Sequence, residues 1–123
     1  MRPVTSDDFV VIDRWLSLWD HPPIHPDLYP PTGLIEDGFG AGWILCTDSK
    51  LCLMENFVTN REVDRTQRRD ACIRIAVALE KIAKERGYKF MGAYTAVSSV
   101  KEAVEQIGYK LANMSWLLGR ELT

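Results

Sequence analysis

Four arginines crowd the first part of a segment that has the pattern of a long helix: Arg61, Arg65, Arg68 and Arg69. The N-terminus of a helix carries partial positive charge, which favours anions and does not favour arginine. A cluster retained against this cost could bind an anionic ligand, since guanidinium groups match the phosphates of a nucleotide-like cofactor. The alternative is a solvated charged face, balanced by nearby acids, namely Glu62, Asp64 and Asp70.

A single acid, Glu55, interrupts the mostly apolar run 51–58, whose composition predicts a strand. A carboxylate in such a run needs a reason, because ionised groups are costly to place among apolar side chains. Two structural explanations are open: the acid lies on the solvated face of the strand, or it pairs with a nearby arginine. A catalytic explanation depends on the resemblance described below.

The histidines and cysteines show no pattern of a metal or nucleophile site. His21 and His25 are separated by three residues that include two prolines, which gives the two rings no predictable common geometry. The cysteines, Cys46, Cys52 and Cys72, are three in number without CxxC spacing, so we expect free thiols and no zinc site. Cys52 and Cys72 have no base partner in the sequence and are interpreted as buried packing residues.

Hydrophobic periodicity gives the order of the elements. Asp64 and Gln67 have the spacing of a capping box, and a helical apolar face that includes Ile75 and Leu79 follows them until Gly87. The expected elements are a helix over 9–19, strands over 33–35, 42–47 and 51–58, a long helix over 64–86, a strand over 89–95, a short helix over 98–107, and strands over 109–111 and 115–118.

Composition limits the classes of protein to consider. A chain of 123 residues with 46% hydrophobic and 26% charged residues is expected to fold as one domain, 1–123. Its 17 acidic and 15 basic residues give no overall positive field, so nucleic acid and anionic membranes are not expected partners. We find no signal peptide and no apolar run of membrane-spanning length, which favours a cytoplasmic location.

Three local patterns carry a resemblance to a known family; they lie at 2–9, at 55–58, and at the two helix ends 83–89 and 105–110. With the order of the elements, they resemble the GNAT-type N-acetyltransferases over nearly the whole chain. The resemblance implies an α/β (α+β) fold: a central mixed, mostly antiparallel sheet flanked by helices, with a first strand at 2–4. The likeness is closest to small GNAT-like proteins of tailed bacteriophages, which share the Tyr-Pro-Pro-Thr-Gly segment 29–33 and the Asn-Met-Ser turn 113–115.

The same resemblance assigns a candidate site. Glu55 takes the position of the carboxylate that removes a proton from an attacking amine, and acetyl-CoA would enter beside Phe57 and Val58. In the family, a Gln/Arg-x-x-Gly-x-Gly/Ala loop after this strand binds the cofactor pyrophosphate through backbone N–H groups. Gln67 takes the first position of that loop.

This chain departs from the family pattern in ways that bear on activity. The two glycine positions of the loop are occupied by Asp70 and Cys72, so the pyrophosphate loop is degenerate, and a carboxylate there would repel a diphosphate. Arg68 and Arg69 could replace the lost backbone donors with guanidinium groups. Val104 takes the position of the family's tyrosine acid and has no proton to give to a leaving thiolate.

Two functions therefore compete, and a sensor that binds a small ligand in the same cleft is a third alternative. The first is an acetyl-CoA-dependent N-acyltransferase that acts on an amine of a small molecule or a protein, with activity reduced by the degenerate loop. The alternative is a catalytically inactive GNAT-like domain that serves as a phage-encoded binding or assembly module, with a protein partner or a place in the virion. A phage origin would place the chain in the host cytoplasm or in the virion.

Overall fold

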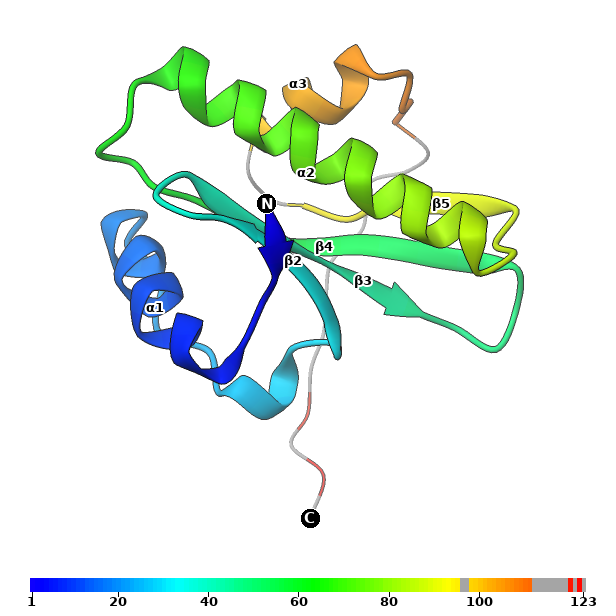
Figure 1. Ribbon diagram of the computed structural model, residues 1–123, viewed down its shortest axis with the longest axis horizontal. Helices are drawn as coiled ribbons and strands as arrows, with labels where there is room; N and C mark the ends of the chain where they lie inside the picture. Colours follow the sequence, from blue (N-terminus) through cyan, green and yellow to red (C-terminus); the bar gives the residue numbers. More distant parts are fainter. Residues whose placement is uncertain (96–97, 112–119, 121, 123) are drawn as a thin grey trace.

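Five strands form one sheet in the order β1-β2-β3-β4-β5 (Figure 1). The computed structural model describes residues 1–95, 98–111, 120 and 122. The strands are β1 (Arg2–Pro3), β2 (Thr32–Glu36), β3 (Gly40–Cys46), β4 (Leu51–Thr59) and β5 (Phe90–Ala93). The pairs β1–β2, β2–β3 and β3–β4 are antiparallel, and the pair β4–β5 is parallel.

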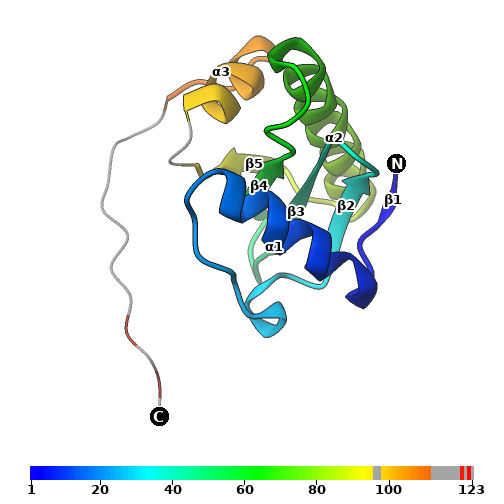
Figure 2. The same cartoon turned by 90° about the vertical axis from the view of Figure 1, so that its left-hand side faces the viewer.

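Helices cover both faces of this sheet. The long helix α2 (Arg65–Glu85) and the short helix α3 (Ser98–Gln106) lie on one face, and α1 (Phe9–Leu18) lies on the other (Figures 1 and 2). Two short 3₁₀ helices, η1 (Ser6–Asp8) and η2 (Pro26–Leu28), flank α1 along the chain. Within the described part of the chain, no helix is long and apolar enough to cross a membrane.

The predicted face of α2 forms the centre of the core on its side of the sheet. Asp64 is the N-cap, and its Oδ1 accepts a hydrogen bond from the Gln67 backbone N–H at 3.1 Å. Ile75 and Leu79 are fully buried against β3 and β4, where they pack with Met54. The Asp64 cap and the helical periodicity therefore predicted both ends of α2 to within one residue.

The predicted fold class is confirmed: the sheet is mixed and mostly antiparallel, with helices on both faces. The strand expected at 109–111 is wrong. Gly108 has φ of 101°, and the Tyr109 N–H donates to the carbonyl of Val104, so this stretch caps α3 instead. The Tyr109 hydroxyl then donates to Glu80 on α2 at 3.1 Å. The strand expected at 115–118 lies outside the described residues.

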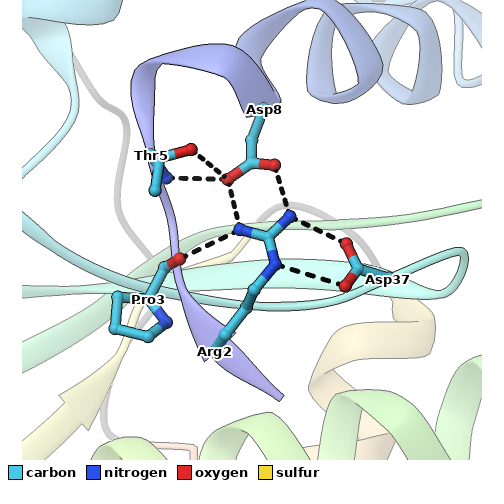
Figure 3. Close-up of polar contacts among 5 residues, drawn as sticks. All are labelled: Arg2, Pro3, Thr5, Asp8 and Asp37. Atoms are coloured by element: carbon cyan, nitrogen blue, oxygen red, sulfur yellow. Dashed lines mark hydrogen bonds and ion pairs between the residues drawn. The ribbon is translucent and has the colours of Figure 1, made fainter.

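An arginine at the start of the chain ties three elements together (Figure 3). The Arg2 guanidinium of β1 donates two hydrogen bonds to Asp8, at 2.7 and 2.9 Å, and two to Asp37 in the β2–β3 turn, at 2.9 and 3.2 Å. Asp8 also accepts from the Thr5 backbone N–H at 2.7 Å. The side chain of Asp8 is 9% exposed and that of Asp37 is 72% exposed. The hydrogen bonds from Arg2 therefore lower the pKa of Asp8 to about 2.

Asp8→Asn is expected to destabilise the protein by about 2 kcal/mol at neutral pH, which is the free energy equivalent of the pKa shift. Because the folded-state pKa is lowered, this stabilisation is present above the ordinary pKa near 3.8 and is lost as pH falls toward 2. Urea unfolding of both proteins at a series of pH values measures the difference. Asp37→Asn is the matched control, since it removes an exposed partner of the same arginine and should cost less. An equal cost for both variants would contradict the burial argument.

Candidate active site at the open end of strand β4

The ladder between β4 and β5 ends halfway along β4. Pairing runs from Leu51 with Phe90 to Met54 with Ala93, and the Tyr94 N–H donates to the carbonyl of Met54 at 3.1 Å. The remaining residues of β4, from Glu55 to Thr59, have no partner in β5. The sheet therefore opens before Phe57.

A bulge marks the point of opening. Ala41 pairs with Val58 and Trp43 pairs with Glu55, so β4 has one more residue than β3 between these pairs. Asn56 accommodates it with φ of 58°, in the left-handed region that asparagine tolerates better than most residues. Opposite the bulge, the Phe57 ring lies so close to Gly42 that a Cβ on Gly42 would meet ring carbon Cε1 at 2.8 Å. The bulge thus needs both a residue that accepts positive φ and a glycine across the strand.

Glu55 lies beside this opening, directly across the ladder from an aromatic residue. Its cross-strand partner Trp43 is 1% exposed, and the Trp43 ring is 4.5 Å from the ring centroid of Tyr29. Glu55 is half-buried, and this burial raises the pKa of its carboxyl group. Within the described residues, no hydrogen bond or ion pair to the Glu55 side chain is found. The ion-paired alternative therefore does not apply to the described structure, and the carboxyl group is suited to hold a proton.

A cavity of about 40 Å³ lies at the other end of this open segment, between the first turns of α2 and α3. It is lined by Thr59, Arg65, Arg68, Arg69, Cys72, Ser99, Val100 and Glu102. The volume holds only a group of a few atoms, so a larger ligand would place one polar group here and extend along the surface. Three guanidinium groups against one carboxylate favour an anion.

The arginines of the cluster divide into two pairs with different roles. Arg68 donates to the carbonyls of Arg61 and Val63 at 3.1 and 2.6 Å, and Arg61 donates to the carbonyl of Leu18 at 3.1 Å. Both guanidinium groups lie over the ring of Trp19, at 5.5 and 4.7 Å from its centroid. These two arginines therefore hold the β4–α2 connection in place.

Arg65 and Arg69 make weaker contacts with the rest of the protein than Arg61 and Arg68 do. Arg65 has a long ion pair of 3.5 Å with Glu102, and Arg69 one of 3.9 Å with Asp70. Both arginines are exposed, so these pairs add little stability. Their guanidinium groups are the ones available to a ligand in the cavity.

The other predicted cofactor residues occupy different positions. Phe57 packs toward α2 and α3, whereas Val58 is 4% exposed in the core on the α1 side, so only its backbone could meet a ligand. Gln67 is exposed and is not among the residues that line the cavity. Asp70 is also absent from the lining; it lies toward Arg69 and Arg74. The repulsion expected from Asp70 is therefore weakened by its direction and by two neighbouring cations.

Sequence reasoning missed several residues of this site. Trp19 fixes the end of β4, because its Nε1 donates to the carbonyl of Thr59 at 2.8 Å. Ser99 and Glu102 bring α3 to the cavity. Ser99 and Glu102 have helical spacing in the sequence, but no local pattern connects Glu102 to Arg65, which lies 37 residues earlier. Among the described residues, no three His, Cys, Asp or Glu side chains gather as a metal site.

No family model and no curated protein matches the sequence. A solved structure described as a probable acetyltransferase is similar to this chain with a TM-score of 0.61 and 12% sequence identity. The match covers 98% of this chain and 100% of the other. The chain therefore has an acetyltransferase-like fold, which agrees with the fold that the sequence resemblance implies.

Glu55→Gln is expected to stabilise the folded protein at pH 7. Because burial raises the folded-state pKa of Glu55, ionisation of the carboxyl group opposes folding above its ordinary pKa, and the cost disappears when the group is protonated. Urea unfolding should show a higher midpoint for Glu55→Gln at pH 7 and no difference at about pH 4. Glu85→Gln, at an exposed position near the end of α2, is the control and should change neither value. A lower midpoint for Glu55→Gln at pH 7 would show that the carboxylate is stabilised by its surroundings.

Proposed function

We propose that this chain is a GNAT-like N-acyltransferase that moves an acyl group from acetyl-CoA to an amine. The observation that carries the proposal is the open half of β4, which has a desolvated carboxyl group at one end and a cationic cavity at the other. Glu55 and Thr59 are four residues apart, and with the bulge at Asn56 between them they are separated by at most roughly 13 Å. A ligand that fits both ends has a phosphate group and a reactive group joined by an extended arm.

The residues present fit such a cofactor by charge. Arg65 and Arg69 would hold its phosphates, with Ser99 as a further donor in the cavity. The helix N-terminus contributes less than in the family loop, because the Asp64 carboxylate already accepts from the Gln67 N–H. The backbone of β4 beyond Met54 is not paired with β5, and its polar groups would meet the amides of the arm.

Glu55 would supply the acid–base step. When bound, acetyl-CoA supplies an acyl thioester, which an amine attacks only in its neutral form. An amine must therefore lose a proton, and the Glu55 carboxylate would accept it directly or through a water molecule. The raised pKa of Glu55 makes it a stronger base than an exposed glutamate. The aromatic side chains of Trp43 and Tyr29 would exclude water on the same face of the sheet.

The second candidate, an inactive binding or assembly module of phage origin, is favoured by one observation. Val104, at the position of the family's acid, is 4% exposed within the core cluster under α2. The valine side chain has no proton to donate to a leaving thiolate. A thiol with a pKa of about 8.5 can leave as the thiolate and then take its proton from water, however, so a missing donor lowers the rate without preventing the reaction.

Coenzyme A is expected to bind the purified protein, and Arg69→Ala is expected to weaken binding by roughly 10-fold at 0.01 M salt, the value of one charge-assisted hydrogen bond. The loss should be smaller at 0.1 M, because the Debye length falls from about 30 Å to about 10 Å. Isothermal titration calorimetry measures the affinity for CoA at both salt concentrations. Arg74→Ala is the matched control: this arginine is on the same helix but pairs with Glu36 of β2, away from the cavity. An equal loss of affinity in Arg69→Ala and Arg74→Ala would show that the cavity is not the phosphate site.

Amine-dependent release of the free thiol of CoA is expected from acetyl-CoA, and Glu55→Gln is expected to lower kcat/KM by about 10²–10⁴-fold, the usual contribution of a general base. A panel of small amines and a lysine peptide serves as acceptors, and a thiol reagent measures the product. Since Glu55→Gln is expected to be more stable than the wild type at pH 7, its loss of turnover would not come from unfolding. Binding of CoA without turnover for any acceptor would favour the inactive binding module. Unchanged turnover in Glu55→Gln would show that Glu55 is not the general base.

A further inference from the structure

Two cysteines face each other across the β3–β4 ladder, at the opposite end of β4 from the cavity. Cys46 is the last residue of β3, Cys52 is the second residue of β4, and the two are Cα partners. Directly paired residues of an antiparallel ladder have their side chains on the same face. This face is the one under the C-terminal part of α2, where Cys52 packs with Ala83 and Tyr88.

The two thiols differ in access and in surroundings. Cys46 is exposed, and Arg86 donates from Nη1 to its Sγ at 3.4 Å. Cys52 is 0% exposed, and its Sγ lies 3.9 Å from the carbonyl oxygen of Phe90, to which it can donate. Burial raises the pKa of the Cys52 thiol and favours its neutral form, whereas Cys46 is open to solvent. Cys46 is therefore the thiol that a reagent in solution meets first.

We propose that Cys46 is a site of thiol oxidation by hydrogen peroxide and that Cys52 resolves the oxidised form into a cross-strand disulfide. This inference does not depend on acyl transfer. In the first step the Cys46 thiolate attacks one peroxide oxygen; the O–O bond breaks, an S–O bond forms, and the leaving oxygen departs as water after it takes a proton. In the second step the Cys52 sulfur attacks the sulfenic sulfur; the S–O bond breaks, the S–S bond forms, and the oxygen leaves as a second water. Two thiols lose two electrons and two protons to one peroxide.

The geometry favours a bond that forms and is readily reduced. Cβ atoms of directly opposite residues lie about 4.5–5.5 Å apart in a ladder, whereas a disulfide requires about 3.5–4.5 Å. Closure must therefore draw the two strand ends together by roughly 1 Å, next to the short β3–β4 connection. Strained disulfides have more oxidising potentials and serve as reversible switches more often than as permanent links. The third cysteine, Cys72, is buried between α2 and α3, with no cysteine packed beside it in that cluster.

The test is oxidation of the purified full chain with a small excess of hydrogen peroxide. The three thiols titrated after denaturation should fall to one, with a mass loss of about 2 Da that dithiothreitol reverses. Cys72→Ala, the matched control, should show the same mass loss. Cys46→Ser should abolish it, and Cys52→Ala should stop at a sulfenic acid that dimedone traps. Three remaining thiols in the wild type, a mass loss that persists in Cys46→Ser, or disulfide-linked dimers in place of the internal bond would each overturn the proposal.

The accessibility of Cys46 has its own readout. Alkylation of the native protein by iodoacetamide should label Cys46 first, because Cys46 is exposed whereas Cys52 and Cys72 are buried. Labelling of Cys52 or Cys72 before Cys46 would contradict the proposed order of oxidation.

Discussion

The parallel pairing of β4 with β5, and its end at Met54 and Ala93, determines most of the rest of the structure. Parallel neighbours in a sheet cannot be joined by a tight turn, so the chain must cross over one face before β5 begins. α2 makes this crossing; its 21 residues span roughly 30 Å, which returns the chain from the end of β4 to the edge beside its start. The start of α2 is thereby placed at the end of β4 where β5 is absent. One connection thus creates both the opening and the cationic wall beside it.

The concentration of arginines at the start of α2 is tolerated because several other groups offset it. Asp64 caps the helix, Glu102 approaches Arg65 from α3, and backbone carbonyls of the β4–α2 connection accept from Arg68. Trp19 adds a ring face beneath two guanidinium groups, a contact worth about 0.5–1 kcal/mol at an exposed site. Arg61 and Arg68 are thus explained by the fold. Among the residues that the structure describes, Arg65 and Arg69 have only long ion pairs, and a structural role does not account for them.

The sequence predicts the elements well wherever periodicity and capping agree. Asp64, the apolar face of α2 and the turn at Gly87 all indicate the same helix, and the structure has it. The features that define the site depend instead on contacts between different elements. The bulge at Asn56 depends on a glycine that lies across the ladder, at position 42, and the loop of Arg68 depends on Trp19 from another element. Such contacts join residues that are far apart in the chain, and local patterns contain no information on them. The direction of Asp70 is a similar case, since alignment to a glycine position does not say which side of the helix the residue faces.

Charged residues in unfavourable electrostatic environments, on β4 and at the start of α2, bear on function more directly than the fold does. A likeness at 12% identity shows that the same architecture can be built from different side chains, and architecture alone does not establish an activity. Glu55 is held in an environment that disfavours its charge, and Arg65 and Arg69 stand at a helix end that disfavours theirs. Neither conflict is relieved by a strong partner among the described residues. Natural sequences are locally consistent except where function requires otherwise. These two conflicts lie at the two ends of the β4 segment that has no partner in β5, and the proposed ligand, which would span this segment, would relieve both.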